Sequence, residues 1–228
     1  MPARLLDGLV SQQYGVALLP VIDFQKMPDL TLLSAGGIGS EDQTLTVRIF
    51  SKVPVQQIGT LACDTESHTS VALARIVLQE SFSIHPELVN LTPADDSEAK
   101  LLIGDKVICD TPGGYPYQLD LGSAWRGLTG LPFLFACWTA KRGAKLGALP
   151  DRLVRAKNEG LAHIEAIIRR DALKKGWPVD IARKYLTQHL QYDVGQRQLD
   201  ALRLFYELSA KHGLLERVRE LRVDDYIR

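Results

Sequence analysis

Short apolar blocks alternate with amphipathic blocks along the first 140 residues of the chain. An apolar block of about 4–8 residues predicts a buried strand, and apolar residues spaced three or four apart predict a helix. Strands are expected at residues 14–21, 30–33, 44–51, 58–63, 85–90 and 101–105. Helices are expected at 2–12 and 71–79, with a helical turn at 22–26 and a surface helix starting within 93–99. This alternation indicates an α/β protein.

Residues 119–138 mark the point where this pattern changes. A polar turn leads into an amphipathic segment around Trp125, a break follows at Thr129-Gly130, and the longest apolar run of the chain covers 131–138. That run is far shorter than the roughly 20 residues of a membrane-spanning helix, so it predicts a strand buried on both faces. Beyond it the pattern is helical, with helices expected at 149–175, 179–190 and 195–211.

The strand at 131–138 is expected to bring the chain back to the lobe in which it began. One strand would leave that lobe at 46–54 and the other would return at 131–138, so that the pair forms a hinge. We therefore predict lobe 1 from residues 1–54 and 132–228, and lobe 2 from residues 55–131. The glycine-rich segment 36–40 is expected to be a flexible, close-approach loop beside the cleft.

Hydroxyl-bearing residues gather where the strand at 58–63 leads into the next helix. Ser67, Thr69 and Ser70 stand at the expected start of that helix, where free backbone N–H groups and the helix dipole suit a carboxylate or a phosphate. An ordinary helix cap by Ser67 or Thr69, without any ligand, explains the same residues. His68 is expected to orient a neighbour or to lie at the surface rather than to act as a base.

The cleft between the lobes is expected to bind a small anion. Strand ends line ligand clefts in α/β sheets, although Asp105 equally suits a cap of the following turn. Besides the helix start, the residues expected at this cleft are Gly39, Ser40, Thr46, Gly104 and Asp105.

The formal net charge of zero argues against a general binder of nucleic acids or anionic membranes. Residues 1–140 hold 8 Lys and Arg against 15 Asp and Glu, whereas residues 141–228 hold 19 against 12. We interpret this asymmetry as solvated helix faces of the second half attracted to an acidic first half, in preference to a nucleic-acid surface.

The three cysteines, Cys63, Cys109 and Cys137, each stand in an apolar, strand-like context. This context predicts buried free thiols and a reducing, cytoplasmic location. No Cys pair or Cys/His cluster has zinc-binding spacing, and no secretory leader pattern opens the chain. We expect no metal and no cofactor.

Several motifs in order resemble the MqnA family, the chorismate dehydratases of the futalosine route to menaquinone. They are FSKVP at 50–54, DTESHTSVALARIVL at 64–78, LLIGD at 101–105, LDLGSAW at 119–125, TGLPFLFACW at 129–138 and LTQHLQYDVG at 186–195. The sister family MqnD, the 1,4-dihydroxy-6-naphthoate synthases, shares part of this set. Its return strand is usually less aromatic than residues 133–138, so the resemblance favours MqnA. The resemblance implies a two-lobed fold like that of type II periplasmic binding proteins.

The implied reaction is loss of water from chorismate to give 3-[(1-carboxyvinyl)oxy]benzoate, in the cytoplasm and without a metal or cofactor. Thr69 and Ser70 would hold a substrate carboxylate, with Ser40 and Gly39 in the neighbouring loop. Thr46 stands where the family usually has a serine and is the candidate for a catalytic hydroxyl. The base stays unassigned, and a substrate carboxylate is one candidate for it.

The chain departs from the family pattern in two places. Asp42-Gln43 stands where the family usually has Gly-Pro, which would add an acid near an anionic substrate. The family also begins with a strand, a helix and a second strand ahead of the position of Pro2, so lobe 1 is expected to lack them and to expose a sheet edge. A late recorded start, a fragment and a degenerate protein are the three explanations. A homo-oligomer would cover such an edge, and the 228 residues alone are expected to be inactive.

Two other functions remain open from the sequence. One is MqnD-like lyase chemistry, and the other is a non-enzymatic solute-binding protein for a small carboxylate. Neither involves nucleic acid or a membrane as partner.

Overall fold

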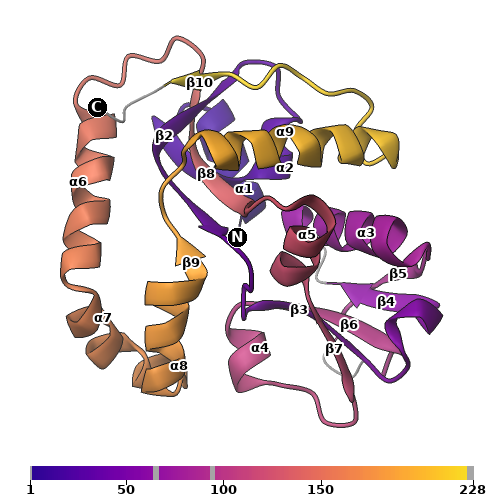
Figure 1. Cartoon of the computed structure of the whole chain (residues 1–228). Coiled ribbons are helices and arrows are strands. Elements are labelled where there is room, and N and C mark those ends of the chain that lie inside the picture. Colours follow the sequence, from indigo (N-terminus) through magenta and orange to yellow (C-terminus); the bar gives the residue numbers. More distant parts are fainter. Residues whose placement is uncertain (1, 64–66, 93–95, 225–228) are drawn as a thin grey trace.

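Two β-sheets form the frame of the protein, and the chain first crosses between them near residues 41–46 (Figure 1). The computed structural model describes residues 2–63, 67–92 and 96–224. The first sheet has the strand order β1-β8-β2-β10, with β9 also paired to β2, and the second has the order β5-β4-β6-β3-β7. The described strands are β1 (Val16–Pro20), β2 (Leu30–Ser40), β3 (Val47–Ser51), β4 (Thr60–Cys63), β5 (Glu87–Asn90), β6 (Ala99–Ile103), β7 (Tyr117–Asp120), β8 (Phe133–Lys141), β9 (Leu190–Gln191) and β10 (Val223–Asp224).

The helices cover the sheets and build an arm at one side of the molecule. Helices α6, α7 and α8 form this arm, and its lower end in Figure 1 approaches α4, which follows β6 of the second sheet. Helix α9 crosses above α3 and α5 in the same view. The described helices are α1 (Pro2–Val10), α2 (Val21–Phe24), α3 (His68–Phe82), α4 (Asp105–Cys109), α5 (Leu121–Thr129), α6 (Leu149–Ala162), α7 (Ile164–Asp171), α8 (Val179–Lys184) and α9 (Gln196–Lys211). Short 3₁₀ turns occupy Val55–Gln57 and Leu173–Lys175, and a π-helical turn occupies Tyr185–His189.

Strand β2 runs through the glycine-rich segment, so the prediction of a flexible loop is wrong there, whereas the predicted close approach is present. It pairs with β8 along most of its length, from Leu30 opposite Lys141 to Ser40 opposite Phe133. A Cβ atom on Gly37 would lie 2.7 Å from the Ala136 carbonyl oxygen, and one on Gly39 would lie 2.6 Å from the Phe133 carbonyl oxygen. The glycines therefore allow close approach of two strands rather than flexibility.

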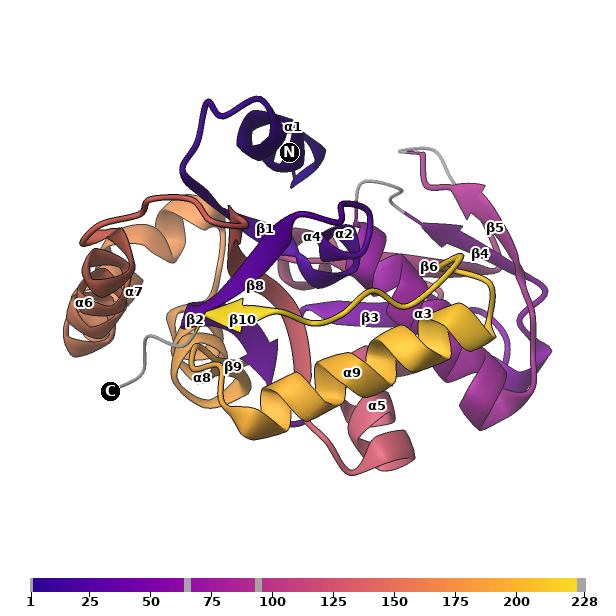
Figure 2. The ribbon, with the colours of Figure 1, turned by 90° about the horizontal axis from the view of Figure 1, so that it is seen from above.

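The second half of the chain contains more than the helices that its pattern predicted. The helix expected at 149–175 is divided at His163 into α6 and α7. Strand β9 pairs antiparallel with β2, and the C-terminal segment returns along the molecule to place β10 parallel to β2, with Val223 opposite Leu32 (Figure 2). A two-residue strand leaves no periodic signal, so sequence patterning missed both.

The pairing of β3 shows where the chain passes from the first sheet to the second. Residues 47–51 pair with β6 and β7, so they hydrogen-bond within the second sheet and not within the sheet of lobe 1, to which the sequence prediction assigned them. The crossing therefore ends before β3. The remaining lobe boundaries stay a prediction.

Trp125 anchors the core between α5, β8 and α9. Its side chain is fully buried, and its indole N–H donates a hydrogen bond to the Pro132 carbonyl oxygen at 2.9 Å. The rings of Phe133 and Phe205 meet it edge to face, with centroid distances of 5.2 and 6.2 Å. The stretch 119–138 thus forms a strand end, a helix and the return strand around one aromatic cluster.

Two of the three thiols are buried, as expected, but Cys109 at the end of α4 is exposed. The prediction for Cys109 is wrong because its apolar context belongs to a short helix and not to a strand. Burial raises the pKa of the Cys63 thiol and of the Cys137 thiol to about 12, so neither forms thiolate at pH 8.

We expect one thiol of the native protein to react rapidly with Ellman's reagent at pH 8, and all three in denaturant. The variant Cys109→Ser should remove the rapid reaction entirely. A rapid phase that survives this substitution would contradict the burial of Cys63 and Cys137.

Two glycines of α5 provide a matched test of its packing. A Cβ atom on Gly122 would lie 2.2 Å from the Asp42 carbonyl oxygen and 2.5 Å from the Thr44 side chain, whereas one on Gly127 meets no atom within 4 Å. Gly122→Ala should lower the free energy of unfolding by about 3 kcal/mol because the crossing loop must move. Gly127→Ala should raise it by about 0.5–1 kcal/mol through helix propensity. Urea unfolding measures both, and equal effects would contradict the close packing at Gly122.

Candidate functional site

A cavity of about 300 Å³ lies between the two sheets, where strand ends from both meet the start of α3. Its walls are mostly apolar, with several hydroxyl groups among them. It is lined by Leu5, Leu18, Pro20, Ile38, Ser40, Thr44, Thr46, Val47, Ser67, His68, Thr69, Ser70, Ile103, Gly104, Phe135, Ala136, Tyr185 and Leu190. Apolar walls with a few converging polar groups are typical of a small-molecule site. We call it the central cavity.

The start of α3 presents donors to the central cavity. Ser67 occupies the N-cap position but forms no side-chain cap hydrogen bond, and the first helical bond runs from the Val71 N–H to the Ser67 carbonyl oxygen at 3.0 Å. The Thr69 hydroxyl accepts a hydrogen bond from the Ile22 N–H at 3.3 Å, which leaves its own proton to donate. This helix start therefore favours an anion site over the ordinary side-chain cap.

Thr46 and Tyr185 meet at the wall of the central cavity. The Thr46 hydroxyl donates a hydrogen bond to the Tyr185 hydroxyl at 3.3 Å, and both side chains line the cavity. Burial, as the largest cause, raises the pKa of the Tyr185 hydroxyl, so this group stays protonated at neutral pH and can donate a hydrogen bond. Sequence patterning missed Tyr185, whose only local signal is the π-helical turn, a form common at functional sites.

His68 is held by a buried carboxylate on α2. Its Nδ1 atom lies 2.8 Å and 3.0 Å from the two carboxylate oxygens of Asp23, and the Asp23 side chain is only 1% exposed. Lys26 pairs with the same carboxylate at 2.5 Å and lies 3.1 Å from Nδ1. Among the described residues that line the central cavity, His68 is the one that can carry a positive charge.

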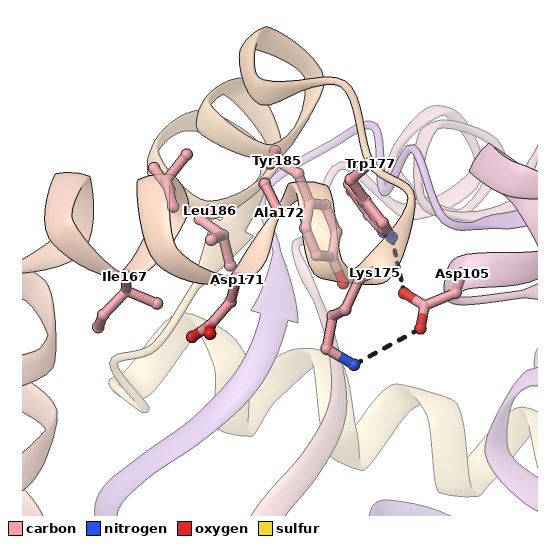
Figure 3. A pocket seen from close by; sticks show the side chains of 10 residues that line it. Asp105, Ile167, Asp171, Ala172, Lys175, Trp177, Tyr185 and Leu186 are labelled. Atoms are coloured by element: carbon pink, nitrogen blue, oxygen red, sulfur yellow. Dashed lines mark hydrogen bonds and ion pairs between the residues drawn. The ribbon is translucent and has the colours of Figure 1, made fainter.

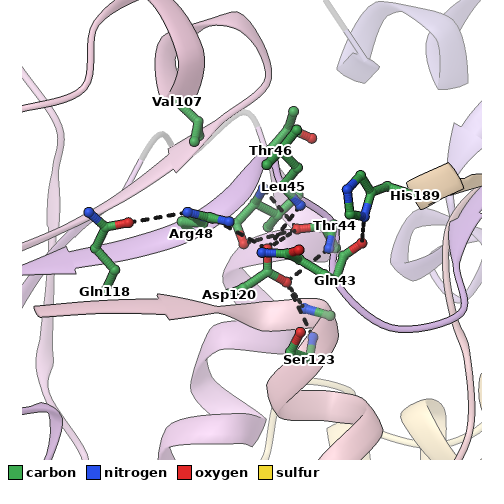
Figure 4. A network of polar contacts seen from close by, with 12 residues as sticks. Gln43, Thr44, Leu45, Thr46, Arg48, Val107, Gln118, Asp120, Ser123 and His189 are labelled. Carbon is green, nitrogen blue, oxygen red and sulfur yellow. Dashed lines mark hydrogen bonds and ion pairs between the residues drawn. The ribbon is translucent and has the colours of Figure 1, made fainter. Parts of the chain in front are cut away.

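Asp120 fixes the crossing loop that carries Thr44 and Thr46 (Figure 4). One carboxylate oxygen accepts from the Thr44 N–H at 2.9 Å and caps α5 through the N–H groups of Gly122 and Ser123 at 3.0 and 3.2 Å. The other accepts from the Leu45 N–H at 2.9 Å and from the Thr44 hydroxyl at 3.1 Å.

The conformation held by Asp120 is an unusual one. Leu45 has a φ of 66°, which is rare for a residue with a branched side chain and persists only where neighbours enforce it. Asp42, which was expected to bring an acid near the substrate, does not line the central cavity, and its carbonyl oxygen accepts from the Ser40 hydroxyl at 3.1 Å.

The central cavity brings together six of the eight residues expected at the site. They are Ser40, Thr46, Ser67, Thr69, Ser70 and Gly104. Gly39 lies in β2 against β8 and does not line the cavity. Asp105 lies apart from it, at the start of α4.

Asp105 joins α4 to the helical arm at a second cavity (Figure 3). It accepts a hydrogen bond from the Trp177 indole N–H at 2.8 Å and lies 3.7 Å from the Lys175 ammonium. This cavity, of about 290 Å³, is also lined by Asp171 and by Tyr185, which lines the central cavity as well. Two carboxylates and the ammonium of Lys175 line it, whereas no carboxylate of the described residues lines the central cavity, so the central cavity is the better site for an anionic substrate.

A family model described as menaquinone biosynthesis matches residues 1–211. The chain belongs to the menaquinone biosynthesis family. The chorismate dehydratase of Thermus thermophilus is 29% identical over 209 residues, which cover 82% of this chain and 76% of that protein. These matches confirm the resemblance to MqnA.

Solved structures confirm the two-lobed, periplasmic-binding-protein-like fold for this member of the menaquinone biosynthesis family. Protein AF1704 from Archaeoglobus fulgidus matches with a TM-score of 0.70 and 20% identity, covering 94% of this chain and 85% of that one. The alkanesulfonate-binding protein SsuA from Xanthomonas axonopodis pv. citri, bound to MOPS, matches with a TM-score of 0.64 and 15% identity over 98% and 85% of the two chains. At these identities the likeness concerns the fold alone.

Within the described ranges, no helix is long and apolar enough to cross a membrane. The same residues contain no group of three or more His, Cys, Asp or Glu side chains arranged to hold a metal ion.

Proposed function

We propose that this protein is a chorismate dehydratase that eliminates water from chorismate to give 3-[(1-carboxyvinyl)oxy]benzoate in menaquinone biosynthesis. The observation that carries the proposal is the central cavity, whose α3 start offers donors for a carboxylate. The similarity to the chorismate dehydratase of Thermus thermophilus supports the same substrate. A cytoplasmic location belongs to the proposal as well.

The reaction mainly requires the protein to position the substrate and the reacting groups. Chorismate carries two carboxylates, a ring diene and an allylic hydroxyl, and loss of that hydroxyl makes the ring aromatic. Aromatisation supplies much of the driving force, so the protein needs to bind the carboxylates, exclude water and place a proton acceptor. The N–H groups at the start of α3 and the hydroxyls of Thr69 and Ser70 suit one carboxylate. Thr46 and Tyr185 provide further donors at the wall of the central cavity.

Incubation of the purified chain with chorismate, followed by mass spectrometry, tests the proposal. We expect a product lighter by one water molecule and an ultraviolet spectrum of a substituted benzoate. The hydroxyl groups and the start of α3 are both present at the central cavity. The structure therefore does not support the expectation that the 228 residues alone are inactive. Unchanged chorismate, together with conversion of cyclic dehypoxanthine futalosine, would favour the MqnD-like reaction instead. Binding of a small carboxylate without conversion of either compound would favour a solute-binding protein.

A further inference from the structure

The central cavity contains two groups of hydrogen-bond donors that belong to different parts of the fold. At the start of α3, the Thr69 hydroxyl contacts the Ile22 N–H of α2. The other group is formed by Thr46 on the crossing loop and Tyr185 directly after α8. The Thr46 carbonyl oxygen accepts from the Gly104 N–H at 2.8 Å, next to α4. Two separate groups of donors suit a substrate with two separate anionic groups.

The donors available to a substrate anion in this cavity are mostly neutral. Its lining contains no lysine or arginine among the described residues, and His68 already contacts the Asp23 carboxylate. A hydrogen bond to an ionised group is roughly twice as strong as one between neutral groups. A single well-placed hydroxyl can therefore distinguish a carboxylate from an apolar group.

The Tyr185 hydroxyl is one such donor. It accepts a hydrogen bond from the Thr46 hydroxyl at 3.3 Å, which leaves its own proton available to another acceptor. Burial, as the largest cause, raises the pKa of Tyr185, the Thr46 hydrogen bond lowers it, and the charge of Asp105 raises it. The hydroxyl therefore stays protonated at neutral pH, and a carboxylate, which only accepts hydrogen bonds, is a matching partner.

The helical arm holds the ring of Tyr185 in place (Figure 3). The Trp177 ring lies against it, with 5.2 Å between the centroids and 40° between the planes, and Trp177 is buried. The Trp177 indole N–H donates to the Asp105 carboxylate at 2.8 Å, and Lys175 pairs with the same carboxylate. Tyr185 is also the first residue of the π-helical turn. Its placement thus depends on the contact with Trp177 and on the local backbone.

Resting on the proposed function, we infer that Tyr185 selects substrates that carry a second carboxylate, and that Trp177 is its positioning residue. The start of α3 would bind one carboxylate through Thr69 and Ser70, and the Tyr185 hydroxyl would donate to the other. A ligand with one carboxylate satisfies one of the two groups of donors, whereas a dicarboxylate such as chorismate satisfies both. The cavity would therefore favour dicarboxylates over monocarboxylates of similar shape, because a polar group that loses water without gaining a partner costs free energy.

Binding of a dicarboxylate and of a matched monocarboxylate tests the inference. The dicarboxylate is 3-[(1-carboxyvinyl)oxy]benzoate, and the monocarboxylate 3-ethoxybenzoate keeps its ring, its ether and its ring carboxylate. We expect Tyr185→Phe and Ser70→Ala each to raise Kd for the dicarboxylate by about tenfold, since each removes one hydrogen bond to a charged group. Kd for 3-ethoxybenzoate should rise in only one of the two variants. Calorimetry measures binding of the dicarboxylate, and ligand-observed NMR measures binding of the monocarboxylate.

Two further variants separate a direct contact from a structural effect. Tyr192→Phe is the matched control, because the Tyr192 hydroxyl donates to the Leu186 carbonyl oxygen at 3.1 Å and Tyr192 does not line the central cavity. It should leave Kd for both ligands within about twofold of the wild type. Trp177→Leu should raise Kd for the dicarboxylate in the wild type but not in the Tyr185→Phe background, because Trp177 acts through the Tyr185 hydroxyl. An effect of Trp177→Leu that persists in that background would overturn the positioning role.

The outcomes distinguish this inference from the proposed function. A wild-type protein that converts chorismate while Tyr185→Phe keeps Kd for the dicarboxylate within twofold would overturn the role of Tyr185 alone. Equal losses of 3-ethoxybenzoate binding in Tyr185→Phe and Ser70→Ala would also overturn it, in favour of a structural role. A protein that shows the predicted losses but leaves chorismate unchanged would overturn the proposed dehydration and support the selection of dicarboxylates.

Discussion

Asp120→Ala is expected to lower the free energy of unfolding by about 3–5 kcal/mol, because it removes the acceptor for several buried or half-buried donors at once. The Asp120 side chain is 8% exposed and accepts from the backbone of Thr44, Leu45, Gly122 and Ser123. An alanine leaves these N–H groups without partners and also removes the cap of α5. Denaturation by urea, followed by circular dichroism, measures the loss.

The same substitution should weaken the site. Leu45 would lose the contact that holds its φ of 66°, so Thr44 and Thr46 would no longer be fixed at the wall of the central cavity. We expect KM for chorismate to rise by about tenfold in protein that remains folded, in line with lost positioning. Asp120→Asn is the matched control, since it keeps the side-chain size and one acceptor oxygen. Its unfolding free energy and its KM should lie between those of the wild type and those of Asp120→Ala. A change of less than about 1 kcal/mol in Asp120→Ala would contradict the role of this network.

Trp125→Ala should cost about 3–5 kcal/mol of unfolding free energy, the usual cost of truncating a buried aromatic residue. The indole is fully buried against Phe133 and Phe205, and its N–H is satisfied by Pro132. An alanine would leave a large cavity where α5, β8 and α9 meet. Because β8 contributes Phe135 and Ala136 to the central cavity, activity should decline with stability.

Two substitutions control for this effect. Trp125→Phe keeps an aromatic ring but loses the hydrogen bond and should cost less than half as much. Trp138→Ala changes a half-buried tryptophan on β8 and should also cost less. Equal losses at Trp125 and Trp138 in urea unfolding would contradict the central place of Trp125 in the core.

Much of the two-sheet frame could be predicted because several of its strands carry a local signal. The apolar blocks at 58–63, 101–105 and 131–138 coincide with β4, β6 and β8 to within three residues. The glycines at positions 36, 37 and 39 led to the prediction of a loop because a close approach of two strands and a flexible loop both favour glycine. Strands β9 and β10 are too short for a periodic signal, and their pairing with β2 depends on tertiary contacts.

The helix start at Ser67, Thr69 and Ser70 could be located from sequence because its chemistry is local. A run of hydroxyl side chains directly before an apolar helix places hydrogen-bond donors and the positive end of the helix dipole at the same helix N-terminus. The cavity's other contributors come from distant segments. Tyr185 reaches Thr46 across 139 positions, and Asp23 reaches His68 across 45 positions. Contacts between residues so far apart in the chain produce no recognisable spacing in a single sequence.

Asp105 shows the limit of reasoning from strand ends. It stands two positions after the end of β6, yet its side chain turns to Trp177 on the helical arm. Its neighbour Gly104, with a φ of 65°, lines the central cavity in its place. The direction of a side chain at a strand end is set by the partner that satisfies it, and that partner lies 72 positions away.

A crystal structure of the chain with the dehydrated product, 3-[(1-carboxyvinyl)oxy]benzoate, tests the account most directly. We predict that the product occupies the central cavity, with one carboxylate at the start of α3 within hydrogen-bond distance of Thr69 and Ser70. Product bound instead in the cavity between Asp105 and Tyr185, or anywhere else on the molecule, would contradict the assignment of the site.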